Sequence, residues 1–171
     1  MSRPRLLVFV ETRSGEQRKL LCRLAEHFYE KGHRVRIAAD SVQAARSLDQ
    51  MLWSFSQESF VPHRILEEDE DPASLPEPVA ISTDRSAGRD EHAILLDGST
   101  DLEAIAHPVA VHFVILDDEE RKQESRRLWL DARDRGWSLH HLSYAPQGRI
   151  WKLLEELDKL EERGEDKGAR S

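Results

Sequence analysis

Acidic residues gather at two points of the chain where catalytic chemistry is commonly found. Asp97 and Asp101 enclose a Gly-Ser-Thr turn, and four acids follow one another at 117–120. Clustered carboxylates bind metal ions and assist phosphoryl transfer in many enzymes. However, the first segment is typical of a turn that caps a helix. The second would begin a helix, where successive side chains diverge and acids complement the helix dipole. We therefore expect no metal ion and no catalytic residue here.

The segment after the first strand-like run is the natural place for a phosphate-binding loop. Residues 11–16 read Glu-Thr-Arg-Ser-Gly-Glu, with one glycine and an acid at each end. A phosphate loop needs successive backbone amides followed by Gly-Lys-Ser/Thr, and a dinucleotide site needs Gly-x-Gly-x-x-Gly. Because the sequence contains neither pattern, it predicts no nucleotide site and no cofactor.

Neither the single cysteine nor the histidines form a nucleophilic or metal-binding motif. Cys22 has apolar neighbours on a predicted helix face, which indicates core packing. His140 and His141 would point to opposite faces of a strand, so they cannot bind one ion together. His63 follows Pro62 and is typical of a hydrogen-bonded loop histidine. The residues alone therefore predict a binding protein.

The first sixty residues show a strand-helix-strand-helix pattern. Apolar runs at 6–10 and 34–39 predict buried strands, and the segment between them carries apolar residues at helical spacing. Gly32 stands where a helix end favours a left-handed residue, and Ser41 is a suitable N-cap for the second helix. The apolar positions expected on that helix are Val42, Ala45, Leu48, Leu52 and Trp53. This order builds a parallel sheet covered by helices.

The rest of the chain continues the alternation of strands and helices. Four further strands are expected, at 79–82, 93–96, 110–116 and 138–144. A polar turn through Gly88 joins the first two, and a short helix is expected at 101–106. A long charged helix capped by Asp117 or Asp118 ends near Gly136. The predicted fold class is α/β: a mostly parallel sheet flanked by helices, similar to nucleotide-binding folds but lacking a nucleotide site.

Two segments are predicted to be surface loops, and the last one is predicted to be an extension. Residues 54–62 are rich in aromatics, and residues 67–78 are acidic and contain prolines. Leucines recur at helical spacing in 149–163, and 164–171 are polar. We expect one α/β domain at 1–152, followed by a helical extension and polar tail at 153–171.

Composition is that of a soluble globular protein. Its 171 residues suit one domain, with 39% hydrophobic and 34% charged residues. A single cysteine excludes an internal disulfide and agrees with a reducing cytoplasm. The net charge of −8 argues against broad DNA binding. No apolar run is long enough to span a membrane, and no signal peptide is expected. We expect a cytoplasmic protein without strong direct DNA binding or membrane attachment.

Three aromatic residues lie within eight positions, at Trp53, Phe55 and Phe60, in a chain with 4 Trp, 2 Tyr and 5 Phe. Two interpretations of this cluster stay open. One is core packing of Trp53 and Phe60, because aromatic side chains are commonly buried. The other is an exposed hot spot for a protein partner, where tryptophan is enriched.

The predicted helix at 119–135 combines cations with an aromatic residue. Arg126, Trp129 and Arg133 recur at three- and four-residue spacing and therefore share one face. A peptide with carboxylates and an apolar end would suit such a surface. The alternative is a solvated helix whose glutamates and arginines pair with one another.

The segment 48–63 resembles a known family. It reads Leu-Asp-Gln-Met-Leu-Trp at 48–53 and Glu-Ser-Phe-Val-Pro-His at 58–63. This is similar to the string Leu-Asp-x-x-Leu-Trp, then Ser-Phe-(Val/Leu)-Pro-His, of the chi subunit family of bacterial DNA polymerase III. Gly32-His33-Arg34-Val35, Arg126-x-x-Trp129 and Trp151-Lys152 are similar to further patterns of that family. The resemblance spans residues 5–152.

The resemblance implies a non-catalytic replication adaptor of the clamp-loader complex. Members of the family bind the acidic, phenylalanine-ended C-terminal tail of single-stranded DNA-binding protein. They also bind the psi subunit or a damage-inducible-type helicase. The residues implied for contact with psi or the helicase are Trp53 and Phe60, together with Leu52 and Val61.

Carried over in the same way, Arg126 and Trp129 would hold the tail. Around them we expect Arg133 and Lys152 as further cations, with Val114 and Ile115 as the wall of an apolar slot. Leu130 stands where many members of the family carry lysine, which removes one cation from the expected tail site.

Two other classes of function stay open from the residues alone. The first is a small α/β enzyme of phosphoryl-transfer type, with Asp97 and Asp117 at the C-terminal ends of strands. Its signature would be a pocket with converging carboxylates and a nest of backbone amides. The second is a structural protein that associates with itself through the leucine-rich last helix.

Overall fold

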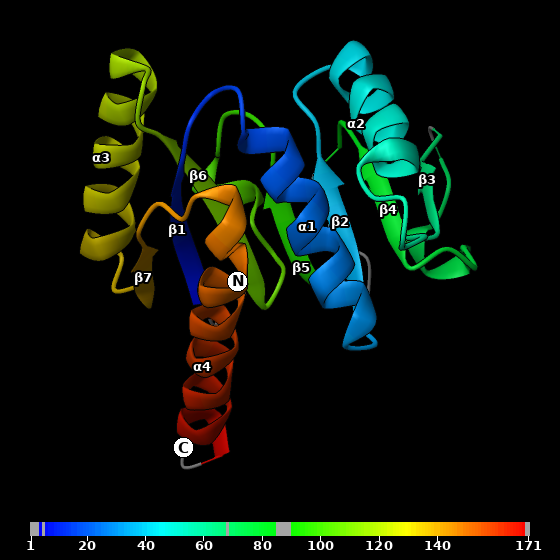
Figure 1. The fold of residues 1–171 in the computed structure, drawn as a ribbon. Coiled ribbons are helices and arrows are strands. Elements are labelled where there is room, and N and C mark those ends of the chain that lie inside the picture. Colours follow the sequence, from blue (N-terminus) through cyan, green and yellow to red (C-terminus); the bar gives the residue numbers. More distant parts are fainter. Residues whose placement is uncertain (1–3, 5, 68, 85–89, 170–171) are drawn as a thin grey trace.

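One seven-stranded sheet forms the centre of the fold (Figure 1). The computed structural model describes residues 4, 6–67, 69–84 and 90–169. In chain order the strands are β1 (Leu6–Thr12), β2 (Arg34–Ala38), β3 (His63–Ile65), β4 (Val79–Ser82), β5 (Glu91–Leu96), β6 (Val109–Ile115) and β7 (Leu139–Leu142). They lie in the order β3-β4-β2-β5-β6-β1-β7, and every neighbouring pair is parallel. The predicted α/β fold with a mostly parallel sheet is confirmed.

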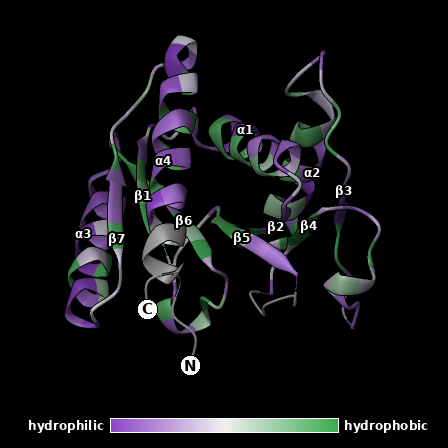
Figure 2. Cartoon of the chain, turned by 90° about the horizontal axis from the view of Figure 1, so that it is seen from below, coloured by the Kyte–Doolittle hydropathy of each residue, from purple (hydrophilic) through white to green (hydrophobic). Residues whose placement is uncertain are grey.

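Four helices of the described chain cover the two faces of the sheet. They are α1 (Gln17–Glu30), α2 (Val42–Ser54), α3 (Glu119–Asp134) and α4 (Ile150–Ala169). The larger apolar core packs α1, α2 and α4 against one face, whereas a smaller core packs α3 against the other. In Figure 2 the hydrophobic residues follow the inner strands, while β7 at the sheet edge is hydrophilic. α3 is therefore separated from the other three helices by the sheet.

The register of the strands decides which side chains meet α3. Phe9 of β1 lies beside His112 of β6 on one side and His141 of β7 on the other. Side chains in such a row of a parallel sheet point to the same face. Phe9 belongs to the core under α3, so this row faces α3. Two residues further along, Glu11 and Val114 form the next row on the same face.

Helix ends follow the predicted capping residues. The side chains of Ser41 and Asp118 accept hydrogen bonds from backbone amides three residues later, at 3.0 and 3.1 Å. Gly32 and Gly136 have φ angles of 85° and 75° just after α1 and α3. A residue with a Cβ adopts such angles only at an energetic cost. Asp118, rather than Asp117, is the cap of α3.

The last helix is longer than expected. α4 continues to Ala169, so the prediction of a polar tail from residue 164 is wrong; residues 170 and 171 lie outside the described residues. Although α4 has 20 residues, no helix of the described chain is long and apolar enough to cross a membrane.

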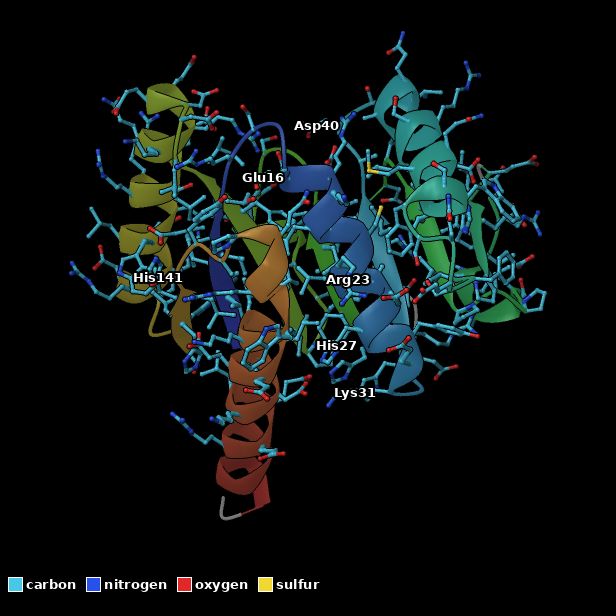
Figure 3. The ribbon with its side chains drawn as sticks, in the orientation of Figure 1. Glu16, Arg23, His27, Lys31, Asp40 and His141 are labelled. Atoms are coloured by element: carbon cyan, nitrogen blue, oxygen red, sulfur yellow. The ribbon has the colours of Figure 1, made fainter. Side chains whose placement is uncertain are left out.

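Buried leucines and contacts with α1 attach α4 to the rest of the fold. Leu153, Leu154 and Leu157 are buried in the larger core, and each contributes about 1.5–3 kcal/mol. Asp158 lies 2.7 Å from the imidazole of His27 and 2.8 Å from the ammonium group of Lys31. Figure 3 labels His27, in the last turn of α1, and Lys31, just after that helix. α4 is thus packed onto α1 and the larger core.

Some local predictions differ from the structure. The strand β3 was not predicted; it begins at His63, which was expected to be a loop residue, and it pairs with β4 at the sheet edge. The helix expected at 101–106 is only a 3-10 turn at Leu102–Ala104, followed by extended backbone at Ile105. The strand expected at 138–144 is shorter, at Leu139–Leu142. The turn expected through Gly88 lies outside the described residues.

Candidate binding surfaces

An open groove lies between α3 and the strands beneath it. Its floor is formed by β1, β6 and β7, its wall by α3, and its volume is 540 Å³. We call it the α3 groove. Its lining residues are Phe9, Glu11, Val114, Leu116, Lys122, Ser125, Arg126, Trp129, Leu130 and His141.

One part of the α3 groove is apolar. The rings of Phe9 and Trp129 meet edge to face, with their centroids 5.0 Å apart. Val114 and Leu116 extend this surface, and Leu130 is 46% exposed at the rim. An aromatic side chain placed here would bury apolar area on both partners.

The wall of the groove is cationic. Lys122 Nζ lies 2.7 Å from the carboxylate of Glu119 and is therefore already paired. In the part of the chain that the structure describes, no carboxylate lies within ion-pair distance of Arg126. A guanidinium binds a carboxylate in a bidentate, charge-assisted way. Among the described residues, Arg126 thus has no ion-pair partner, although its charge helps to lower the pKa of Glu119, and it lies beside the apolar part of the groove.

The floor of the groove carries the opposite charge. Glu11 Oε1 accepts a hydrogen bond from the backbone amide of Tyr144 at 3.0 Å. Glu11 Oε2 lies 3.4 Å from Nε2 of His141, which Figure 3 labels on the side of the molecule where α3 lies. The groove is therefore cationic on the helix side and acidic on the sheet side.

A buried histidine fastens α3 to the sheet beside the groove. His112 Nδ1 lies 2.7 Å from Thr100 Oγ1, and its Nε2 lies 2.8 Å from Ser125 Oγ on α3. Its ring also packs against Phe9, with centroids 5.0 Å apart. Burial, and secondarily the charge of Arg121, lower the pKa of His112 to about 4. The imidazole is therefore neutral near pH 7, when it bridges the two hydroxyl groups.

The structure brings together only some of the residues expected at the tail site. Arg126, Trp129 and Val114 line the α3 groove. Ile115 is fully buried on the opposite face of the sheet, because neighbouring strand residues alternate.

The two further cations expected at the tail site also lie elsewhere. Arg133 does not line the groove and lies 3.6 Å from Asp134. Lys152 belongs to α4, on the other side of the sheet, with Nζ 5.6 Å from the centroid of the Trp151 ring.

A second surface is formed by two exposed aromatic rings. Trp53 and Phe60 are each 59% exposed, and their ring centroids lie 5.4 Å apart. Behind them, His63 packs against Trp53 at 4.8 Å and donates a hydrogen bond from Nδ1 to the carbonyl of Val61 at 2.7 Å. Core packing therefore does not explain this aromatic cluster. We call it the Trp53–Phe60 pair.

The residues expected to flank this pair are not surface residues. Leu52 is 2% exposed and Val61 is fully buried, so they anchor the helix end and loop that present the pair. Conversely, Val42 was expected on the apolar face of α2 but is 58% exposed. Adjacent helix positions differ by about 100° in direction, which separates Leu52 from Trp53.

A large cleft lies at the C-terminal ends of the strands, where α/β enzymes bind phosphate groups. Its volume is 850 Å³, and we call it the strand-end cleft. Asp97, which is 5% exposed, accepts two hydrogen bonds from the guanidinium of Arg18, both at 3.2 Å. Asp40 Oδ1 accepts a hydrogen bond from the Ser99 amide at 3.3 Å.

At the same edge of the sheet, the carboxylate of Asp117 lies against the turn that follows β1, in the position that an anionic ligand would need. Its carboxylate accepts hydrogen bonds from the backbone amide and the hydroxyl of Ser14, both at 2.8 Å. These two bonds lower the pKa of Asp117. The amide that would face a phosphate is thus already bonded within the protein.

No catalytic group stands out in the described residues. No three His, Cys, Asp or Glu side chains of that part of the chain are placed to hold a metal ion. Cys22 is buried in the larger core, and burial, with a smaller effect of Asp97, raises the pKa of its thiol to about 12. The thiol is therefore protonated near pH 7 and is a poor nucleophile.

Two solved structures share the fold of this chain. The chain aligns with T4 UvsW at a TM-score of 0.64 and 8% identity, over 84% of this chain and 42% of that one. It aligns with domain 2 of the DEAD-box helicase Mss116p, solved with an RNA duplex, at a TM-score of 0.57 and 13% identity. That alignment covers 83% of this chain and 64% of the other. At such identities the likeness concerns the fold alone.

Similar sequences point to replication. The chain is 33% identical over 122 residues to DNA polymerase III subunit chi of Escherichia coli strain K12, covering 71% of this chain and 82% of that protein. It is 32% identical over 125 residues to the chi subunit of Pseudomonas aeruginosa, with 71% and 82% covered. It is 26% identical over 123 residues to that of Haemophilus influenzae, with 71% and 83% covered.

Residues 6–140 match the family model described as DNA polymerase III chi subunit, HolC. The match takes in β1, the α2–β3 segment with the Trp53–Phe60 pair, and the whole of α3. The chain therefore belongs to the DNA polymerase III chi subunit family, whose members are accessory subunits of the replicative polymerase.

Proposed function

We propose that this chain is a non-catalytic adaptor with two separate docking surfaces. The α3 groove binds the acidic, phenylalanine-ended C-terminal tail of single-stranded DNA-binding protein. The Trp53–Phe60 pair binds the psi subunit or a damage-inducible-type helicase. The two surfaces lie on different helices, α3 and α2, that pack on opposite faces of the sheet, so both partners can bind at once.

The observation that carries the tail assignment is the unpaired guanidinium of Arg126 beside an open apolar slot. A phenylalanine-ended peptide offers one ring and a terminal carboxylate on the same residue. The slot between Phe9, Val114 and Trp129 accepts the ring. Arg126 then lies within the same groove to pair with the carboxylate.

The assignment of the second surface is supported by exposure. Trp53 and Phe60 together expose two large rings that a monomer would ordinarily bury, and tryptophan is a frequent hot-spot residue. His63 and the buried Leu52 and Val61 hold the rings in place, so little side-chain entropy is lost on binding.

The direct test of both assignments is binding of each partner to the full chain. An acidic peptide ending in phenylalanine should bind with one-to-one stoichiometry in calorimetric titration. The same peptide with a C-terminal amide in place of the carboxylate should bind at least tenfold more weakly, because the bidentate contact is lost. Equal affinity for the two peptides would contradict the tail assignment.

Trp53→Ala tests the second surface. It should lower affinity for psi or the helicase by tenfold or more, the usual effect of a hot-spot tryptophan, and leave peptide binding unchanged. Val42→Ala is a matched control, because Val42 is equally exposed on the same helix. A Trp53→Ala protein that unfolds, by circular dichroism, would mean that Trp53 supports the core instead.

A further inference from the structure

The α3 groove contains a carboxylate that an acidic peptide would be expected to avoid. Glu11 is part of its floor, in register with Val114 and facing α3. Its side chain is 25% exposed and lies next to the apolar slot. Like charges repel, so Glu11 opposes a ligand carboxylate that approaches the floor.

Glu11 is fixed in this position by the chain beyond β7. One of its oxygens accepts the Tyr144 amide at 3.0 Å and the other lies 3.4 Å from His141 Nε2. These contacts limit its rotation away from the groove. A carboxylate has further acceptor sites beyond these two contacts, and Glu11 is partly exposed in the groove.

The two sides of the groove therefore favour different chemical groups of a ligand. The α3 wall, with Arg126, attracts carboxylates. The floor, with Glu11, attracts hydrogen-bond donors such as backbone N–H groups and repels carboxylates. A peptide satisfies both only in one orientation across the groove.

We infer that Glu11 is a specificity-determining residue of the α3 groove. It selects peptides that place their terminal carboxylate against α3 and an uncharged residue, just before the terminal aromatic, over the floor. This inference rests on the proposed tail binding and adds which acidic peptides the groove accepts. The groove therefore distinguishes acidic peptides by the positions of their acidic residues and not only by the number of these residues.

The test uses two acidic peptides that differ only in the residue before the terminal phenylalanine, which is Gln in one and Glu in the other. Wild type should prefer the Gln peptide by roughly threefold to tenfold, the effect of one unit-charge repulsion across a few ångströms in a partly exposed groove. Glu11→Gln, which keeps the acceptor for Tyr144, should abolish this preference and bind both peptides at least as tightly as wild type binds the Gln peptide.

Glu124→Gln is the matched control, because it makes the same change in net charge at an exposed position of α3 outside the groove. It should keep the wild-type preference. If wild type and Glu11→Gln prefer the Gln peptide to the same extent, the inference is overturned, while the proposed tail binding stays intact. Absence of binding of both peptides to both proteins would overturn the tail assignment, and the inference with it.

Discussion

The α3 groove and the strand-end cleft differ in how one prominent charged group of each is paired within the protein. In the cleft, the carboxylate of Asp97 is bonded to the guanidinium of Arg18, and Ser14, which lines the cleft, is bonded through its amide and hydroxyl to Asp117. In the groove, Arg126 has no carboxylate partner among the described residues. The cleft lies where this fold usually binds its ligand, yet its polar groups stabilise the protein itself. The position of a cleft in the fold does not by itself assign a function to it.

The largest expected effect is a loss of stability at low pH, caused by His112, which attaches α3 to the sheet. His112 has a pKa of about 4 in the folded protein against an ordinary value of 6.5. The unfolded chain takes up this proton near pH 6.5, whereas the folded chain does so only near pH 4. Stability should therefore fall as pH drops from 6.5 to 4, by about 3 kcal/mol in total.

His112→Gln keeps hydrogen-bonding groups at this position but does not titrate. Urea unfolding at pH 7 and pH 4.5 should show a smaller loss of stability on acidification in His112→Gln than in wild type. The same loss in both proteins would mean that His112 is protonated in the folded state, and that the wall is not held by a neutral imidazole.

Removing Arg18 from the strand-end cleft should lower stability, whereas removing Arg126 from the α3 groove should lower peptide affinity. Arg18→Ala leaves the carboxylate of Asp97, 4% exposed, without its guanidinium partner. Because Arg18 itself is 39% exposed, the cost is moderated by solvent, and we expect about 1–3 kcal/mol of destabilisation. Peptide affinity should not change. Chemical denaturation and peptide titration of this one variant measure both quantities, and a loss of affinity without loss of stability would reverse the comparison.

The smallest effect expected is a gain of affinity. Leu130 is 46% exposed at the rim of the α3 groove. Leu130→Lys would add a cation beside the bound tail and should tighten peptide binding by about twofold to fivefold, the contribution of one screened surface charge. The gain should disappear at 0.5 M salt, because the added cation acts through a solvent-exposed, screened interaction. Weaker binding at low salt would show that the leucine itself contacts the ligand.

Much of the fold was predictable because local signals agreed with it. Ser41, Gly32 and Gly136 stand at helix ends in the roles their residue types favour. The apolar runs of β1 and β6 are continuous because both faces of a parallel sheet are covered. Because these runs are apolar on both faces, the sequence does not show which face of the sheet each side chain points to. The opposite orientations of Val114 and Ile115 could therefore not be assigned from the sequence.

The sequence predicted residues of a binding surface only where spacing along one helix brings them together. Arg126 and Trp129 share a helix face, and helical spacing is enough to pair them. Glu11, Phe9 and His141 meet only through the pairing of β1 with β7, which joins residues far apart in the chain. The last turns of α4, beyond residue 163, were missed because their residues are polar and have the composition of a tail.

The most direct test of the adaptor account is titration of the phenylalanine-ended acidic peptide into Arg126→Ala and Arg127→Ala. Both variants lose one exposed arginine from α3, but only Arg126 lines the α3 groove, whereas Arg127 lines a hollow on the other side of the helix. We predict that Arg126→Ala weakens binding by about tenfold to a hundredfold, and that Arg127→Ala changes it by less than about threefold. Equal losses in the two folded variants would contradict a tail site in the α3 groove.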